Sequence, residues 1–188
     1  MTRLSDQFDD MDLDDFEELL AEKPRDEKRE LIGGRVVKMM VGAPSEHNFV
    51  LQNLASGLQT RLRDAGSPCR TLVESFRLKE AALRTSVLPD IIVKCGPLQP
   101  GASSLNDRTA LIEVLSDGSV GRDRVEKWHV YQKLPSLLRY LFVERDRPRI
   151  EVFDRSGDAW FTHRVLEGLD AVLALPALEV SVPLAEIY

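Results

Sequence analysis

Two carboxylates stand where the sequence would otherwise be apolar. Asp90 interrupts the strand-like run 88–93, and Glu113 interrupts the run 111–115. Burying a carboxylate is strongly unfavourable unless the group is paired or binds a metal. If the two strands are neighbours, both acids can face one side and offer oxygen ligands to a Mg²⁺ ion that keeps several waters. Such an ion polarises a phosphoryl group and acidifies a bound water, so the chemistry would be phosphodiester hydrolysis.

Lys127 is the amine that would complete this group, because it lies on the predicted helix that directly follows the Glu113 strand. A lysine beside the acids would stabilise developing negative charge or orient the attacking water. The alternative is purely structural: each buried carboxylate pairs with a lysine or arginine, and no metal binds. Residue types alone favour that alternative.

The elements that must position these residues are read from the spacing of apolar residues. Helical periodicity predicts helices over 12–23, from 45 to about 65 and over 122–134, with Ser45 as N-cap of the second. Gly33 and Gly34 supply the positive φ values of a hairpin turn. The segment 96–106, rich in glycine, proline and serine, predicts an exposed loop. Strands are expected at 29–32, 35–40, 70–78, 87–93, 109–115, 138–143, 150–154, 160–165 and 180–182.

The distribution of charge is compatible with binding of a polyanion to part of the chain. The formal net charge of the 188 residues is -6. Residues 1–30 hold twelve acidic and five basic side chains, so the rest of the chain holds 20 basic and 19 acidic ones. The acidity therefore belongs to the N-terminal segment, and the basic side chains around 122–149 are available to a nucleic acid. Charge patterning alone supports equally well an ordinary solvated surface.

Other features of the sequence exclude several classes of protein. There are two cysteines, Cys69 and Cys95, and no Cys-x-x-Cys pair, which excludes a zinc ribbon and predicts reduced thiols in a cytoplasmic protein. No signal peptide and no membrane-spanning segment are expected. A small-molecule hydrolase would need a Ser/His/Asp or Cys/His motif, for which there is no local support.

The ordered set of motifs resembles the PD-(D/E)XK nuclease superfamily and, within it, the Uma family of restriction-endonuclease-like proteins. The resemblance covers most of the chain. Its pieces are the hairpin segment 29–37, Pro44-Ser45-Glu46-His47 before the long helix, Pro89-Asp90, Ile112-Glu113-Val114-Leu115-Ser116, and Arg122-Asp123-Arg124-Val125-Glu126-Lys127 followed by Tyr131.

The resemblance implies a role for each matching residue. Asp90 and Glu113 would bind Mg²⁺, or Mn²⁺ in its place, and act in catalysis with Lys127. In that superfamily a lysine usually stands two residues after the second acid, where this chain has Leu115, so the amine would come from Lys127 on the helix instead. Accessory roles would fall to Glu30, His47 and Tyr131, and phosphate contacts to Arg122 and Arg124. The competing interpretations are a surface salt bridge for Glu30, helix packing for His47 and core packing for Tyr131.

These observations predict an α+β (mixed α/β) fold with a restriction-endonuclease-like core, in which helices flank a central mixed β-sheet. Residues 1–24 would form an acidic helix of the same domain, and residues 25–188 one endonuclease-like domain. The expected function is metal-dependent hydrolysis of DNA, without an organic cofactor or a membrane partner. Because cleaving a duplex requires two cuts, a homodimer is expected. The alternative is a non-catalytic DNA-binding or protein-interaction module built on the same fold.

Overall fold

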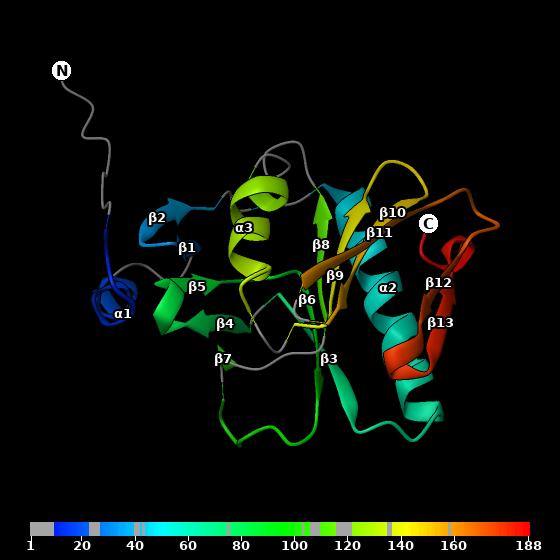
Figure 1. Ribbon diagram of the computed structural model, residues 1–188, viewed down its shortest axis with the longest axis horizontal. Coiled ribbons are helices and arrows are strands. Elements are labelled where there is room, and N and C mark those ends of the chain that lie inside the picture. Colours follow the sequence, from blue (N-terminus) through cyan, green and yellow to red (C-terminus); the bar gives the residue numbers. More distant parts are fainter. Residues whose placement is uncertain are drawn as a thin grey trace.

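A computed structural model of the chain describes residues 10–22, 27–39, 42, 44–74, 76–102, 104–105, 110–115, 122–134, 137–157 and 159–188. At positions 104–105, 122–123 and 159–161 only the backbone is described. The elements form an α+β architecture of two larger sheets, a short β-ribbon and helices, as the sequence predicts (Figure 1). None of the helices in these ranges is long and apolar enough to span a membrane.

A six-stranded sheet carries the predicted acids, with strand order β11-β10-β9-β8-β6-β3. Its central strands β8 and β9 are parallel, and the other neighbours are antiparallel. A parallel pair needs a crossover connection, and helical turns occupy the crossover from β8 to β9. The strands are β3 (Cys69–Val73), β6 (Ile91–Cys95), β8 (Ala110–Leu115), β9 (Arg139–Glu144), β10 (Arg149–Ser156) and β11 (Ala159–Glu167).

Helices cover both faces of this sheet, and alternation along β8 decides which side chain meets which helix. Ala110, Ile112 and Val114 pack in the core beneath α2 (Ser45–Asp64). Leu111 and Leu115 pack on the opposite face, under η2 and α3, so Glu113 between them faces that side too. The covering elements are α2, β12 (Val172–Leu175), β13 (Val180–Pro183), η3 (Pro176–Leu178) and η4 (Leu184–Glu186) on one face, and η2 (Arg122–Lys127) and α3 (Trp128–Tyr131) on the other.

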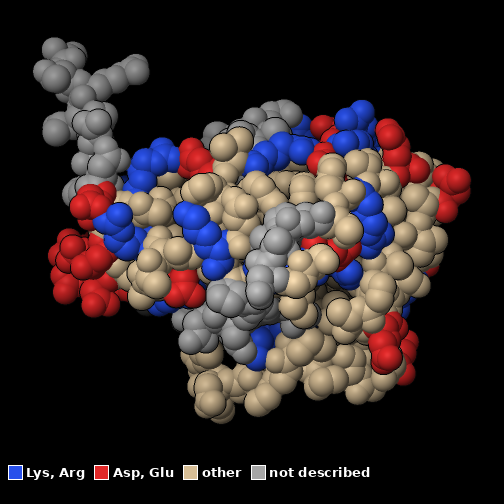
Figure 2. Space-filling view, in the orientation of Figure 1, with Lys and Arg blue, Asp and Glu red and all other residues tan. Residues whose placement is uncertain are grey.

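A second, smaller sheet holds the N-terminal hairpin. Gly33 and Gly34 have φ values of +59° and +88°, which confirms the predicted turn. The acidic helix α1 (Leu13–Glu22) packs on this sheet through Phe16, which is fully buried beneath the Arg77 guanidinium. Figure 2 shows the acidic side chains gathered over α1 at one end of the molecule. The strands, in order, are β2 (Arg35–Lys38), β1 (Arg29–Ile32), β5 (Thr85–Val87), β4 (Arg77–Glu80), with η1 (Ala81–Leu83) after it in the chain, and β7 (Ser104–Leu105).

Two strands predicted as continuous are each divided between the sheets. The prediction for 70–78 was wrong because Glu74 adopts a left-handed φ of +52°, which turns the chain from β3 towards β4. The prediction for 87–93 was wrong because the chain leaves β5 before Pro89 and enters β6 after Asp90. Proline has no N–H for a sheet ladder, so it stands at this boundary. Asp90 therefore lies just before a strand rather than inside one.

Four further expectations need correction. Pro44, not Ser45, is the N-cap of α2, and no side chain caps that end. Cys69 and Cys95 are not free thiols: they face each other in the β3–β6 register and form a disulfide. The predicted loop 96–106 contains the short strand β7. The helix predicted over 122–134 is a π-helical turn followed by a short α-helix that ends at Tyr131.

Candidate active site

A hydrogen bond places Asp90 beside Glu113. In the antiparallel β6–β8 pair, Ile91 lies opposite Ile112, and Asp90 directly precedes Ile91. Asp90 Oδ2 accepts a hydrogen bond of 2.7 Å from the backbone N–H of Val114. The Asp90 carboxylate therefore lies against the β8 backbone next to Glu113.

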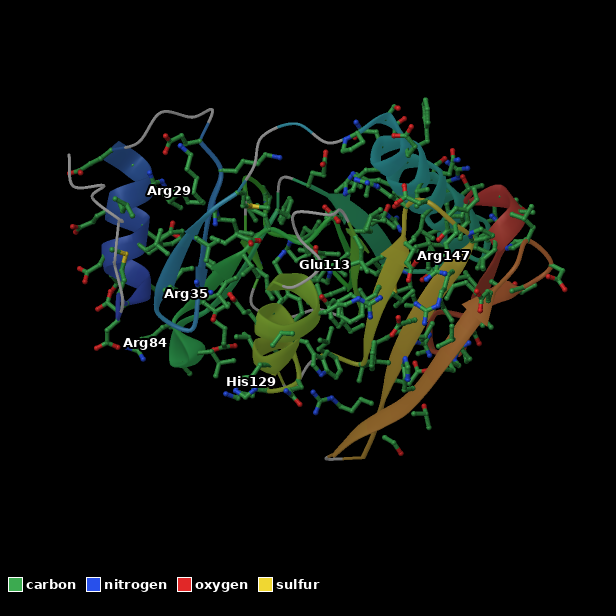
Figure 3. All side chains as sticks on the ribbon, turned by 90° about the horizontal axis from the view of Figure 1, so that it is seen from above. Arg29, Arg35, Arg84, Glu113, His129 and Arg147 are labelled. Carbon is green, nitrogen blue, oxygen red and sulfur yellow. A yellow bond between two sulfur atoms is a disulfide. The ribbon has the colours of Figure 1, made fainter. Side chains whose placement is uncertain are left out.

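Lys127 reaches Glu113 from the helical turn above the sheet. Its Nζ lies 3.0 Å from Glu113 Oε1 and 3.2 Å from Glu30 Oε1. Lys127, Glu113 and Glu30 are 1%, 2% and 0% exposed, respectively, so this is a fully buried group of one amine and two carboxylates. Figure 3 shows Glu113 in the middle of the molecule, between the helical layers. The π-helical turn of η2 ends at Lys127, which places this side chain over β8.

Glu30 joins the N-terminal hairpin to the acids. The same Oε1 that contacts Lys127 accepts a 2.8 Å hydrogen bond from the backbone N–H of Leu88, two residues before Asp90. Because Glu30 is completely buried, its interpretation as a surface salt bridge was wrong. Glu30 therefore ties β1 to both Lys127 and the Leu88–Asp90 segment.

Tyr131 and His47 each contact one of the acids. The Tyr131 hydroxyl donates to Glu113 Oε1 at 3.2 Å, and the ring is fully buried in the core. His47, in the first turn of α2, places Nε2 3.5 Å from Asp90 Oδ2. The Asp90 carboxylate raises the pKa of His47, against the opposing effect of burial. Both residues thus pack in the interior and also contact the predicted site.

The remaining predicted positions lie farther along η2 and β8. Arg124 stacks its guanidinium over the Phe142 ring at 5.0 Å and donates to Glu151 at 2.8 Å. The side chain of Arg122 lies outside the described part of the chain. Leu115 is 5% exposed and packs in the core on the Glu113 face, so this position carries an aliphatic side chain and no amine.

A hollow on the surface lies beside these charges rather than over them. It has a volume of about 580 Å³ and runs between the hairpin turn and the outer side of η2 and α3. Its lining includes Arg35, Val125 and Trp128 but not Asp90, Glu113 or Lys127. Asp90 is the most exposed of the acidic site groups, with 19% of its side chain open, so a substrate would approach from its side.

The donor set fits one Mg²⁺ ion with a largely aqueous shell. No group of three or more His, Cys, Asp or Glu side chains suited to a metal occurs among the described residues. Magnesium commonly takes only one or two carboxylates and completes its octahedron with water and substrate phosphate. Asp90 uses Oδ2 for the Val114 N–H and Glu113 uses Oε1 for Lys127, and each carboxylate has a second oxygen. Lys127 lies against Glu30 and Glu113, and His47 lies against Asp90.

One group beside the site was missed from the sequence. Glu151, on β10, accepts hydrogen bonds from Arg124 and Arg149 at 2.8 and 2.6 Å. Burial acts to raise the pKa of Glu151, but the two guanidinium groups outweigh it and lower the pKa to about 2. The sequence signal was one acid, Glu151, within the otherwise apolar segment 150–153, which alone does not identify its partners.

Comparisons with known proteins agree with this fold. Residues 13–185 match the model of the Uma2 family, described as "Putative restriction endonuclease". The Synechocystis sp. protein sll1609 is 25% identical over 167 residues, covering 87% of this chain and 93% of its own. A second Synechocystis protein, slr1290, is 26% identical over 143 residues, covering 76% and 74%. A crystal structure from Anabaena variabilis, described as "a putative nuclease belonging to DUF820", superposes with a TM-score of 0.72 at 17% identity, over 94% of this chain and 97% of that one. The restriction-endonuclease-like fold is thereby confirmed, and the chain belongs to the Uma2 family.

Proposed function

We propose that this protein is a metal-dependent endonuclease that hydrolyses phosphodiester bonds of DNA. The observation that carries the proposal is the convergence of Asp90, Glu113 and Lys127, from a strand entrance, a strand and a helical turn, within a buried acidic site. Family membership and the nuclease-like fold support the same reaction class.

Asp90 and Glu113 would hold Mg²⁺, with Mn²⁺ as a substitute. When bound, the ion would supply Lewis-acid polarisation of the phosphate and a more acidic water. Lys127 donates a hydrogen bond to Glu113 and forms an ion pair with Glu30, and both contacts fix its position. Its ammonium can stabilise negative charge that develops on the phosphate. Tyr131 orients Glu113 through the hydrogen bond to Oε1. Arg122 and Arg124 are proposed to contact phosphate.

Glu30 is assigned a positioning role rather than a place in the metal shell. Its Oε1 is already shared by Lys127 and the Leu88 N–H. It thus sets the distance between the amine and the segment that carries Asp90. We also propose that two copies associate when the substrate is a duplex, since two strands must be cut.

A specific observation favours a second candidate, the non-catalytic module. Lys127 pairs with both Glu30 and Glu113, and such ion pairs account for the burial of these carboxylates without a metal. Leu115, two residues after Glu113, stands where the superfamily usually has a lysine, and this difference also favours the non-catalytic module. A module of this kind would bind DNA or protein but would cut neither strand.

Nicking of supercoiled plasmid in Mg²⁺ and in Mn²⁺ separates the two candidates. The wild type is expected to nick, and Asp90→Asn, Glu113→Gln and Lys127→Met are expected to lose at least about 10²-fold in rate, as for removal of a principal charge-stabilising group. Glu186→Gln is the matched control, because it removes an exposed carboxylate paired with Arg61 on the other face of the sheet. Nicking that persists in all three site variants, or none by the wild type in either metal, would reject the endonuclease.

A further inference from the structure

A second group of charges lies in the same row of the sheet as Glu113. The register pairs Glu113 with Phe142 on β9, and Phe142 with Glu151 on β10. These three residues therefore form a row across the face that η2 covers. Lys127 and Arg124, three residues apart on η2, reach Glu113 and Glu151, the two ends of that row. The η2 turn thus places Lys127 against Glu113 and Arg124 against Glu151, one basic side chain beside each acid.

Arginines dominate the second group. Glu151 accepts from Arg124 and Arg149 through Oε1, and its Oε2 lies 3.2 Å from His163 Nε2. Arg149 also donates to Glu144 at 2.7 Å. Arg147, in the β9–β10 connection, bonds the same Glu144.

The arginine cluster is defined as Arg124, Arg147 and Arg149. Its guanidinium groups hydrogen-bond Glu144 and Glu151, and Glu167 lies opposite Arg149 in the β10–β11 register. The guanidinium side chains are 30%, 59% and 21% exposed, respectively, which leaves them open to an anion. Figure 3 shows Arg147 on the outer side of the β9–β10 end, to one side of Glu113, and Figure 2 shows basic side chains on the surface in that region.

We propose that the arginine cluster is a second phosphate subsite. It would bind a DNA phosphate that neighbours the phosphate at the cleavage position on the same strand, and this inference rests on the proposed function. A guanidinium carries five N–H donors and binds phosphate bidentately, so an arginine held by a carboxylate keeps donors to offer. Glu144 and Glu151 hold the side chains extended, which lowers the entropy lost on binding.

The separation of the two sites suits a continuous strand. Glu113 and Glu151 lie two strand spacings apart, roughly 10 Å. Phosphates of one strand of B-DNA wind around the axis, so they lie farther apart through space than their axial rise of about 3.4 Å, and this gap suits a phosphate close in sequence to the cleaved one. A DNA strand with one phosphate at Asp90 and Glu113 would present another to the arginine cluster.

The test is the salt dependence of DNA binding, measured by fluorescence anisotropy with a labelled 20-base-pair duplex in EDTA, so that no cleavage occurs. Arg147→Ala is the principal variant because its side chain is the most exposed and its loss leaves Glu144 bonded to Arg149. Each lost phosphate contact should reduce the magnitude of the negative slope of log K against log salt by about 0.9 and weaken binding about eightfold at 0.1 M salt. Arg124→Ala should do the same, provided its circular dichroism remains that of the wild type.

Arg61→Ala is the matched control, since Arg61 pairs with Glu186 in a bidentate manner beyond the opposite face of the sheet. Its slope and affinity should remain those of the wild type. If the wild type binds DNA and nicks plasmid while Arg147→Ala keeps the wild-type slope, the phosphate subsite is rejected and the proposed endonuclease stands. If the wild type does not bind DNA, both are rejected.

Discussion

Replacing Lys127 by methionine tests how much the buried ion pairs of Glu30 and Glu113 stabilise the fold. Methionine keeps much of the volume but removes the amine that Glu30 and Glu113 share at 3.2 and 3.0 Å. Removing one partner of a buried ion pair costs about 3–5 kcal/mol, because the remaining charge is uncompensated. Two carboxylates lose the same partner here, so we expect a loss in the upper half of that range, about 4–5 kcal/mol at pH 7. Since a domain is stable by about 5–15 kcal/mol, the variant should fold only marginally.

The measurement is urea denaturation followed by circular dichroism. Lys38→Met is the matched control, because Lys38 pairs with Glu27 on the surface, where an ion pair contributes little to stability. Adding Glu113→Gln to Lys127→Met should recover part of the lost stability, since a neutral amide replaces one uncompensated charge. A loss below about 1 kcal/mol for Lys127→Met would refute the reasoning, because it would mean that water or another cation already solvates both carboxylates.

Three further predictions concern the frame around the site. Gly34→Ala should cost about 1–3 kcal/mol in urea denaturation, because φ is +88° and the new Cβ would lie 3.2 Å from the Arg84 guanidinium carbon; an unchanged midpoint would contradict this. Phe16→Ala should release α1 from the smaller sheet, seen as fast amide exchange over 13–22, and protected amides there would show that the ring does not hold the helix. The folded-state pKa of Glu151, about 2, lies below its ordinary value of 4.5, so its stabilising contribution is complete above pH 4.5 and lost as pH falls towards 2. Wild type should therefore lose stability more steeply across that window than Glu151→Gln, and parallel curves would argue against the ion pairs.

Local patterns predicted most of the elements. The Gly33–Gly34 hairpin, the long helix α2 and the buried strand β8 follow from turn chemistry and apolar spacing, which act over a few residues. The divided strands did not follow, because the choice between two sheets depends on tertiary pairing and on the left-handed φ of Glu74. The Cys69–Cys95 pairing was missed for the same reason: only the β3–β6 register brings the two together.

Part of the candidate site could be predicted because burying a carboxylate within an apolar segment costs free energy unless a partner or a metal compensates for it. That argument identified Asp90 and Glu113, and chain order together with family resemblance identified Lys127. The burial of Glu30 could not be predicted, because hairpin residues are usually exposed and its partners Leu88 and Lys127 are distant in sequence. The ion pairs of Glu151 could not be predicted, because Arg124 and Arg149 belong to different elements, η2 and β10.

Calorimetric titration of Mg²⁺ and of Mn²⁺ into the wild type and into Asp90→Asn and Glu113→Gln tests the central claim directly. The wild type should bind one ion per chain, and each variant should bind at least about tenfold more weakly, since each removes one of two charged ligands. Glu186→Gln should titrate as the wild type does. Heats of dilution alone for the wild type, or equal affinity in all four proteins, would contradict the account of Asp90 and Glu113 as a metal site.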